Sequence, residues 1–304
     1  RFKIPAAGLL TAGANALSVR TVDHGLAAAK ASTRVEAPVC IYGGTPGKWS
    51  LLAAANLDGQ RLGIDVLAAD QATVYGRSPV IHKVYAMGLA PTRAAGFSQI
   101  GEGALGIAAA GRDRLYKLGT DGVLYQYAGG AWTAMARTLA APLRLVPGAT
   151  RLYVPCADGS LAVYSNTAIA QIDPPSAYRE HVALGDVLHA IGPDGLVYRY
   201  YQGPPQTWKS TGGEPMRRLV AGYGYLFGET QTGQGRLYDG KGWRPLGELG
   251  RSYVLGRETL YVLRGNGTLV AYSTATGAVT GIGTMCGGCV AVDTHVVALI
   301  NPTA

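Results

Sequence analysis

The fold is decided by the stretch Asp113-Arg114-Leu115-Tyr116-Lys117-Leu118-Gly119-Thr120-Asp121-Gly122-Val123-Leu124-Tyr125-Gln126-Tyr127, the clearest of five copies of one short unit between Gly111 and Gly277. In each copy an alternating apolar run reaches a glycine turn, and a second alternating run leaves it. A tyrosine follows each turn glycine by five residues. These tyrosines recur every 34–38 residues: Tyr127, Tyr164, Tyr200, Tyr238 and Tyr272. An offset kept through five copies indicates a structural repeat.

Each unit is predicted to be a β-hairpin. The turns Asp121-Gly122, Asp158-Gly159, Asp194-Gly195 and Asn266-Gly267 suit a tight reversal, because glycine takes positive φ without steric cost and Asn or Asp tolerates it. Period-2 alternation with Leu, Val and Tyr predicts half-buried strands on both sides. The fourth copy is longer and more polar over 228–235, which predicts a looser loop.

Two further short strands complete each repeat. An apolar strand precedes each hairpin, as in Leu219-Val220-Ala221, and a second turn and strand follow, as in Gly129-Gly130-Ala131-Trp132. Four strands in about 36 residues are typical of a β-propeller blade. One such sheet cannot bury both of its faces alone, so the repeats are expected to stack into a closed array. The sequence predicts an all-β fold, a single closed β-propeller over residues 1–304.

Eight blades are favoured, from blade openings near residues 9, 52, 107, 145, 182, 219, 253 and 289. The count becomes seven if residues 52–106 do not form a full blade, and 77–106 is expected to be an irregular insertion. Residues 1–8 and 289–301 are expected to share one sheet, so that the blade closed by the N- and C-terminal strands leaves no exposed edge.

Composition excludes several classes of partner. The net charge is +8, but Lys and Arg are scattered, whereas a nucleic-acid surface should cluster them. No transmembrane segment is expected, because no stretch approaches the roughly 18 consecutive apolar residues of a membrane span. Residues 1–5 do not begin a signal peptide. We expect a mature exported bacterial protein, secreted or in the cell envelope, or a fragment of a longer protein.

No catalytic residue, metal site or cofactor is predicted. The Asp-x-Asp-x-Asp calcium loop and the Gly-x-Ser-x-Gly elbow are missing from the sequence. The five histidines do not show the i, i+4 spacing of a zinc protease. These histidines are His24, His82, His181, His189 and His295. They are interpreted as single strand or surface residues. The alternative is that radial repetition brings some of them towards the central channel.

The sharpest local motif is Cys286-Gly287-Gly288-Cys289. It is interpreted as a structural disulfide, and free thiols or a metal or redox role remain alternatives. A redox role calls for a helix N-terminus, which lowers the thiol pKa, but this motif is expected in a glycine-rich turn between strands. Cys40 and Cys156 provide no second CxxC pair. Four cysteines are compatible with an oxidising compartment.

One aromatic combination recurs at the outer strands and is the only repeated candidate ligand site. The tryptophans either pack between blades or offer flat faces on which sugars stack. The candidate ligand-binding residues are Tyr42, Trp49, Tyr127, Trp132, Tyr200, Trp208, Tyr238 and Trp243.

The copy from Thr259 to Val279 resembles the PQQ-like repeat, in which a strand and an "NG" turn are followed by L-x-A-x-D-x-x-T-G. Tyr272 stands here where that family has its aspartate. The copies with Gly-Val-Leu-Tyr and a later Trp resemble tectonin-type repeats. The first resemblance implies a protein-assembly scaffold of the bacterial envelope, and the second implies a lectin for surface glycans. The adjacent Cys-Cys pair of catalytic quinoproteins does not occur.

The leading hypothesis is a non-catalytic binding or scaffold propeller that presents a protein- or glycan-recognition face. One alternative is a multivalent tectonin-like lectin, whose weak equivalent sites would gain avidity. The other is a hydrolase or lyase with its site in the central channel, which predicts a deep polar pocket containing a strongly perturbed carboxylate or histidine.

Overall fold

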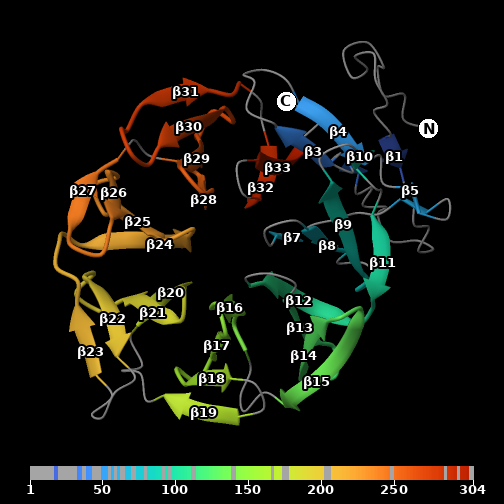
Figure 1. Cartoon of the computed structure of the whole chain (residues 1–304), viewed down its shortest axis with the longest axis horizontal. Coiled ribbons are helices and arrows are strands. Elements are labelled where there is room, and N and C mark those ends of the chain that lie inside the picture. Colours follow the sequence, from blue (N-terminus) through green and yellow to red (C-terminus); the bar gives the residue numbers. More distant parts are fainter. Residues whose placement is uncertain are drawn as a thin grey trace, which may run out of the picture.

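The protein is a ring of antiparallel sheets (Figure 1). The computed structural model describes residues 17–19, 33–35, 39–42, 49–53, 56–57, 60–61, 66–69, 73–78, 81–90, 93–94, 97–110, 114–137, 142–165, 168–172, 178–201, 207–246, 250–283, 286–292 and 295–300. This part of the chain contains strands and turns and no helix, so it has no helix that is long and apolar enough to cross a membrane.

Six blades have four strands each, counted outwards from the centre of the ring. The first strands are β12 (Ala104–Ala109), β16 (Val146–Pro147), β20 (Arg179–Leu184), β24 (Met216–Gly222), β28 (Ser252–Leu255) and β32 (Cys286–Val292). The second strands are β13 (Leu115–Gly119), β17 (Arg151–Pro155), β21 (Val187–Ile191), β25 (Tyr225–Thr230), β29 (Thr259–Leu263) and β33 (His295–Ile300). The third strands are β14 (Val123–Ala128), β18 (Leu161–Ser165), β22 (Val197–Tyr201), β26 (Gly235–Tyr238), β30 (Leu269–Ser273) and β3 (Val39–Tyr42). The fourth strands are β15 (Ala131–Arg137), β19 (Ala168–Ile172), β23 (Thr207–Ser210), β27 (Trp243–Pro245), β31 (Val279–Gly281) and β4 (Trp49–Ala53).

A five-stranded sheet occupies the remaining place in the ring. It consists of β7 (Val66–Ala69), β8 (Thr73–Arg77), β9 (Val84–Ala90), β10 (Arg93–Ala94) and β11 (Ser98–Gly101). Both β10 and β11 pair with β9, and β7 contacts the first strands β12 and β32 of the blades on either side. The range 77–106, expected as an irregular insertion, therefore contains three strands of this sheet.

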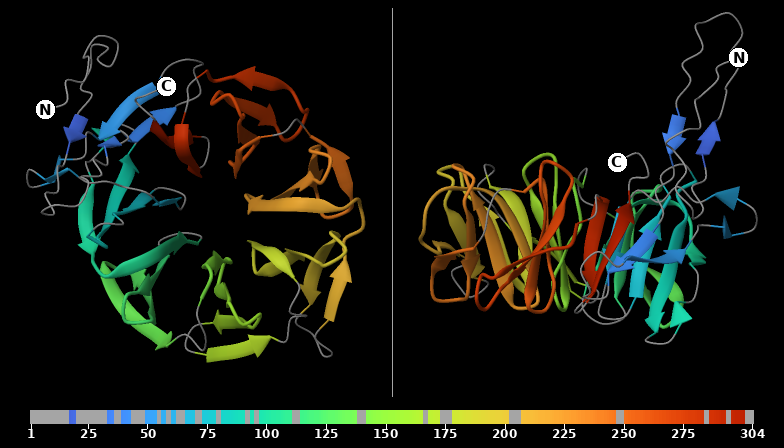
Figure 2. Two further views of the ribbon diagram at one scale, coloured as in Figure 1. Left: turned by 180° about the vertical axis from the view of Figure 1, so that it is seen from behind. Right: turned by 90° about the horizontal axis from the view of Figure 1, so that it is seen from above.

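The expected count of eight blades is wrong, and seven regular blades do not form either. The stretch 9–25, expected to open a blade, contributes β1 (Leu17–Val19), which pairs only with β2 (Thr33–Val35) and stands away from the ring (Figure 2). The stretch 52–106, expected as one further blade, does not form a regular four-stranded blade. It forms the short hairpin of β5 (Asn56–Leu57) and β6 (Gln60–Arg61) and the five-stranded sheet. The strands form six four-stranded blades.

One blade joins distant parts of the chain. In it β3 and β4 complete the sheet begun by β32 and β33, with Val39 opposite Leu299 and Tyr42 opposite Val296. This pairing removes an exposed sheet edge. Residues 1–8, the strand expected in this sheet, lie outside the described residues.

The repeated hairpin is one turn used five times. Each turn glycine has φ between 75° and 88° and donates its N–H to the carbonyl oxygen three residues earlier. These glycines are Gly122, Gly159, Gly195, Gly233 and Gly267. The expected looser loop in the fourth copy is therefore wrong. Because backbone geometry closes the turn, Thr232 can replace the usual Asp or Asn before the glycine.

The core lies between neighbouring blades. One cluster joins Tyr153 and Leu161 of the blade β16–β19 to Leu188 and Tyr200 of the blade β20–β23. Another joins Ile191 of β21 to Leu226 of the following blade. Neighbouring sheets thus bury each other's faces, which is why the repeats require a closed ring.

Candidate functional site

The first strands of the blades surround the centre of the ring (Figure 1). Because neighbouring strands are antiparallel, the start of each first strand lies at the same end of its sheet as the turn between the second and third strands. We call this end of the ring the turn face. It carries the five repeated glycine turns.

A β-bulge recurs near the start of the first strand. The register shifts between Ala104 and Gly106 in β12, between Arg179 and Val182 in β20, and between Met216 and Arg218 in β24. A bulge adds one residue to a strand and re-aims the neighbouring side chains. The bulges therefore change which side chains appear at the inner edge of the turn face, and alternation in the sequence did not reveal them.

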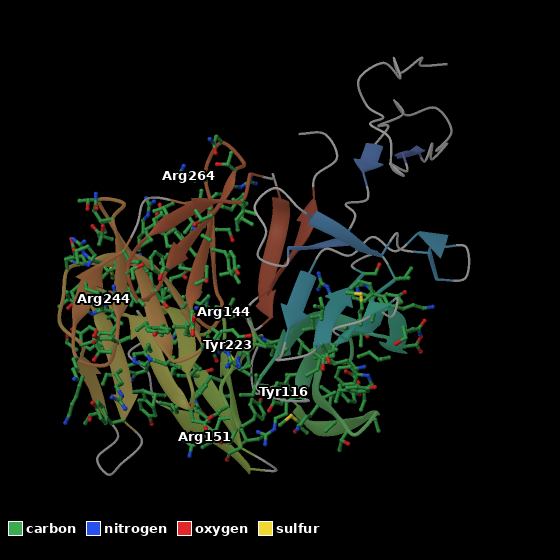
Figure 3. All side chains as sticks on the ribbon, turned by 45° about the horizontal axis from the view of Figure 1, so that its top comes forward. Tyr116, Arg144, Arg151, Tyr223, Arg244 and Arg264 are labelled. Atoms are coloured by element: carbon green, nitrogen blue, oxygen red, sulfur yellow. The ribbon has the colours of Figure 1, made fainter. Side chains whose placement is uncertain are left out.

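Four consecutive blades place an exposed arginine at or beside this position. We call Arg144, Arg179, Arg217 and Arg251 the arginine row. Figure 3 shows Arg144 on the inner side of the ring. At the start of the blade β12–β15 the exposed residue is instead Leu105, which is 45% exposed, and beside Arg144 lies Leu143, which is 68% exposed.

The aspartates of the turn face are engaged within their own turns. Asp121 accepts hydrogen bonds from the Val123 N–H and the Tyr125 hydroxyl, and these bonds lower the pKa of its carboxyl group. Asp158 accepts from both the N–H and the hydroxyl of Ser160, which lowers its pKa in the same way. These carboxylates stabilise turns rather than pairing with the arginine row.

A pocket of about 490 Å³ opens on the turn face between two blades. Its walls come from the segment before β16, the turn between β17 and β18, and the start of β20. The polar lining includes Arg144, Ser160, Tyr178, Arg179 and His181. Asp158, Glu180 and the buried Cys156 also line it, together with apolar residues such as Leu143 and Leu161. This volume is in the range of small-ligand sites.

His181 is the most unusual group in this pocket. Its side chain is 7% exposed, and its Nε2 atom is buried without a hydrogen-bond partner in the described part of the chain. Burial, followed by the charge of Arg144, lowers the pKa of His181 to about 4. At pH 7 the wall of this pocket therefore contains a neutral imidazole whose buried Nε2 has no partner among the described residues.

The backbone beside His181 is also unusual. Glu180 has φ of 51°, a left-handed conformation that costs a residue other than glycine on the order of 1–3 kcal/mol. Next along the pocket wall, Tyr178 packs on Trp208 with ring centroids 4.6 Å apart and on Tyr198 at 5.3 Å. The pocket wall is thus coupled by direct contact to an outer-strand tryptophan.

The predicted Tyr/Trp residues do come together as pairs. Tyr127 and Trp132, Tyr200 and Trp208, and Tyr238 and Trp243 are cross-strand neighbours with ring centroids 5.1–5.2 Å apart. Tyr42 and Trp49 are opposite each other in the same register, but their side chains lie outside the described residues.

Each described tryptophan packs against the preceding sheet. Trp132 joins a cluster with Tyr75 and Val84, and Trp243 joins one with Ile191. Trp243 also donates its N–H to the Thr211 hydroxyl at 3.2 Å. Packing between blades accounts for these contacts, and sugar stacking on the half-buried indoles stays a prediction.

The cysteine motif lies in strand β32 and not in a turn between strands, with Cys286 opposite Ile300 and Cys289 opposite Ala298. The side chains of Cys286 and Cys289 lie outside the described residues, so the expected disulfide stays a prediction. The side chains of His24, His295 and Cys40 also lie outside them. His82 is half-buried and lies 3.3 Å from the carbonyl oxygen of Ala104 through Nδ1.

His181 is not poised as a general base in this pocket. General-base work at neutral pH calls for a pKa near 7, whereas that of His181 is about 4. Within the described part no hydrogen bond joins its Nε2 to a hydroxyl or thiol that could act as a nucleophile. That part also contains no group of three or more His, Cys, Asp or Glu residues arranged to hold a metal ion.

Sequence comparison gives no relative: no family model matches the chain, and no curated protein matches it. Solved structures do share the fold. Human WBSCR16 has a TM-score of 0.66 at 10% identity, covering 93% of this chain and 95% of its own. Prp20p from Saccharomyces cerevisiae has a TM-score of 0.65 at 10% identity, covering 86% and 91%. Yeast RCC1 (Prp20) bound to Kap60 has 0.64 at 10%, covering 88% and 89%.

The chain is therefore a β-propeller repeat protein. Its fold is similar to that of RCC1-like propellers, and the resemblance to PQQ-like or tectonin-type repeats is not confirmed. At 10% identity the similarity shows the fold alone.

Proposed function

We propose that this chain is a non-catalytic protein-binding propeller that holds an acidic partner on its turn face. The observation that carries the proposal is the arginine row, with one exposed arginine at the same end of the first strand in four consecutive blades. Arg179 and Arg251 are exposed, and neither has a side-chain partner among the described residues. Arginine is enriched in protein interfaces and pairs well with carboxylates.

Two further observations support a protein as the partner. The exposed Leu105 and Leu143 extend the row with apolar surface, and a mixed apolar and arginine patch is typical of interface centres. Among proteins of similar fold, Prp20p has binding properties towards Gsp1p and histones. Export to the bacterial envelope is part of the proposal, because four cysteines are compatible with an oxidising compartment. Immunoblotting of cell fractions tests it.

The experiment places a photo-crosslinking amino acid at position 179, and separately at Lys241 as a control. Lys241 is exposed in the turn between β26 and β27, on the opposite face. Proteins captured from the native host at position 179 but not at 241 are then purified. Their affinity is measured for wild type, R179E, R251E and K241E.

We expect both arginine reversals to weaken binding by roughly tenfold or more, and added salt to weaken it too. K241E should bind like wild type. Equal effects of R251E and K241E, or binding that is indifferent to salt, would refute the proposal.

A further inference from the structure

We infer that the pocket between the blades β16–β19 and β20–β23 binds a carboxylate group, held between Arg144, Arg179 and the imidazole of His181. This inference goes beyond the proposed function, because the pocket could accept a free small molecule as well as an acidic side chain or chain terminus of a partner. Both sources present the same group.

Comparison among the blades shows that His181 is out of place as a core residue. It immediately precedes the residue of its first strand that pairs with His189. The corresponding residues of four other blades are Ile107, Leu145, Leu219 and Tyr253. Blades of this type therefore accept an apolar residue here, and burying an imidazole nitrogen without a partner is destabilising. A ligand atom would supply the missing partner.

The charges around His181 indicate an anion. Arg144 and Arg179 line the same pocket, and a guanidinium can donate two parallel hydrogen bonds to a carboxylate. An imidazole protonated on Nε2 would add a third donor. Bulge geometry and the positive φ of Glu180 position His181 at the start of β20, which is consistent with strain retained at a binding site.

The acidic side chains of the lining favour a carboxylate over a phosphate. Asp158 and Glu180 lie in the same pocket, and both would repel a doubly charged phosphate more strongly than a singly charged carboxylate. Leu143, which is 68% exposed, adds apolar surface for an organic body. The ligand class is therefore an organic monocarboxylate.

Tryptophan fluorescence offers a direct readout, because Tyr178 lines the pocket and packs on Trp208. The full chain is titrated at constant ionic strength with benzoate, N-acetylglycine (which mimics a peptide terminus), benzamide (which lacks the charge) and inorganic phosphate. The ¹⁵N shift of the His181 ring is followed in parallel.

We expect the two carboxylates to bind and to move the His181 resonance, with benzamide and phosphate at least roughly tenfold weaker. H181L should remain folded, since leucine occupies this position in other blades, and should lose binding by a similar factor. R251E, outside the pocket, should leave carboxylate binding unchanged even where it abolishes partner binding, so the two proposals can fail separately.

The choice of probe separates the sources. Tighter binding of N-acetylglycine than of benzoate would indicate a peptide terminus, and the reverse would indicate a free aromatic acid. The inference is overturned if no carboxylate binds, if phosphate binds best, or if H181L binds as wild type does.

Discussion

Trp132 donates its indole N–H to the carbonyl oxygen of Ile100 at 2.7 Å. This bond ties the fourth strand β15 to β11, the last strand of the preceding sheet. The indole lies directly against Gly101. The outer rim of the ring is therefore held by tryptophans that require glycine beneath them, and Trp243 repeats the arrangement on Gly213.

The first prediction follows from this contact. In G101A the added methyl group would overlap the Trp132 indole, so we expect the variant to lose about 1–3 kcal/mol of unfolding free energy, as overpacking does. Urea unfolding followed by far-UV circular dichroism measures it. Gly106 is the matched control, because no atom lies within 4 Å of an added Cβ there. A G106A variant as unstable as G101A would contradict the explanation.

The hairpins between Gly111 and Gly277 were predictable, because glycine at positive φ and period-2 alternation are local requirements. The pairing of Tyr127 with Trp132 followed from the same register. The blade count failed where the local signal was weak, since the Asp-Gly pair of residues 52–106, Asp58-Gly59, falls between the two-residue strands β5 and β6 and not between strands of the five-stranded sheet.

The candidate site was not predicted, for a different physical reason. The sequence singled out tryptophans because they recur, and recurrence in a propeller reflects the packing that every blade needs. The pocket depends on departures from the repeat: His181 at an apolar position, and an arginine beside a bulge. Aligning the copies by their turn glycines shows the histidine, but the bulge that positions it requires the three-dimensional register.

The second prediction concerns His189, which is 2% exposed with its Nδ1 unpartnered in the described part of the chain. Six residues before the turn glycine, the other copies have Tyr116, Tyr153, Phe227 and Tyr261. H189F should fit the blade and raise the unfolding free energy at pH 7 by about 1 kcal/mol, because it removes an unsatisfied buried nitrogen.

The reciprocal variant tests the same idea. F227H places an imidazole at the equivalent position of the next blade and should lower stability by about 1–3 kcal/mol. Both are measured by urea unfolding. A destabilised H189F would mean that the His189 nitrogen has a partner that the fold needs.

The third prediction is a loss of stability in mild acid. Burial, followed by nearby arginines, lowers the pKa of both His181 and His189 to about 4. Between pH 6.5 and 4 the unfolded chain binds protons at these residues that the folded chain does not. Stability is therefore fully present above pH 6.5 and falls as the pH drops towards 4, by on the order of 3 kcal/mol for each histidine.

Urea unfolding of wild type, H189F and H181L at pH 7, 6, 5 and 4.5 measures this slope. Each variant should remove about half of it. The carboxylates of Asp121 and Asp158, whose pKa values are lowered, contribute only at lower pH. Stability that stays flat from pH 7 to 4.5 would show that the histidines are accessible to water.

The last prediction concerns an asymmetric ion pair. The side chain of Glu229 is fully buried and accepts a hydrogen bond from Arg217 at 2.6 Å, while that of Arg217 is 47% exposed. Arg218 lies 3.9 Å from the other carboxylate oxygen. R217A leaves a buried carboxylate short of its main partner and should cost about 1–3 kcal/mol. E229L leaves Arg217 free to turn into water.

E229L should therefore cost less than R217A, within about 1 kcal/mol of wild type. Leucine also fits the blade, since Leu118 and Leu263 stand at the equivalent position of other copies. In the double variant, R217A should add little to E229L, because the buried charge that needs the arginine is gone. Thermal and urea unfolding of the four proteins provide this cycle. A larger loss in E229L than in R217A would mean that the carboxylate itself holds the strands together.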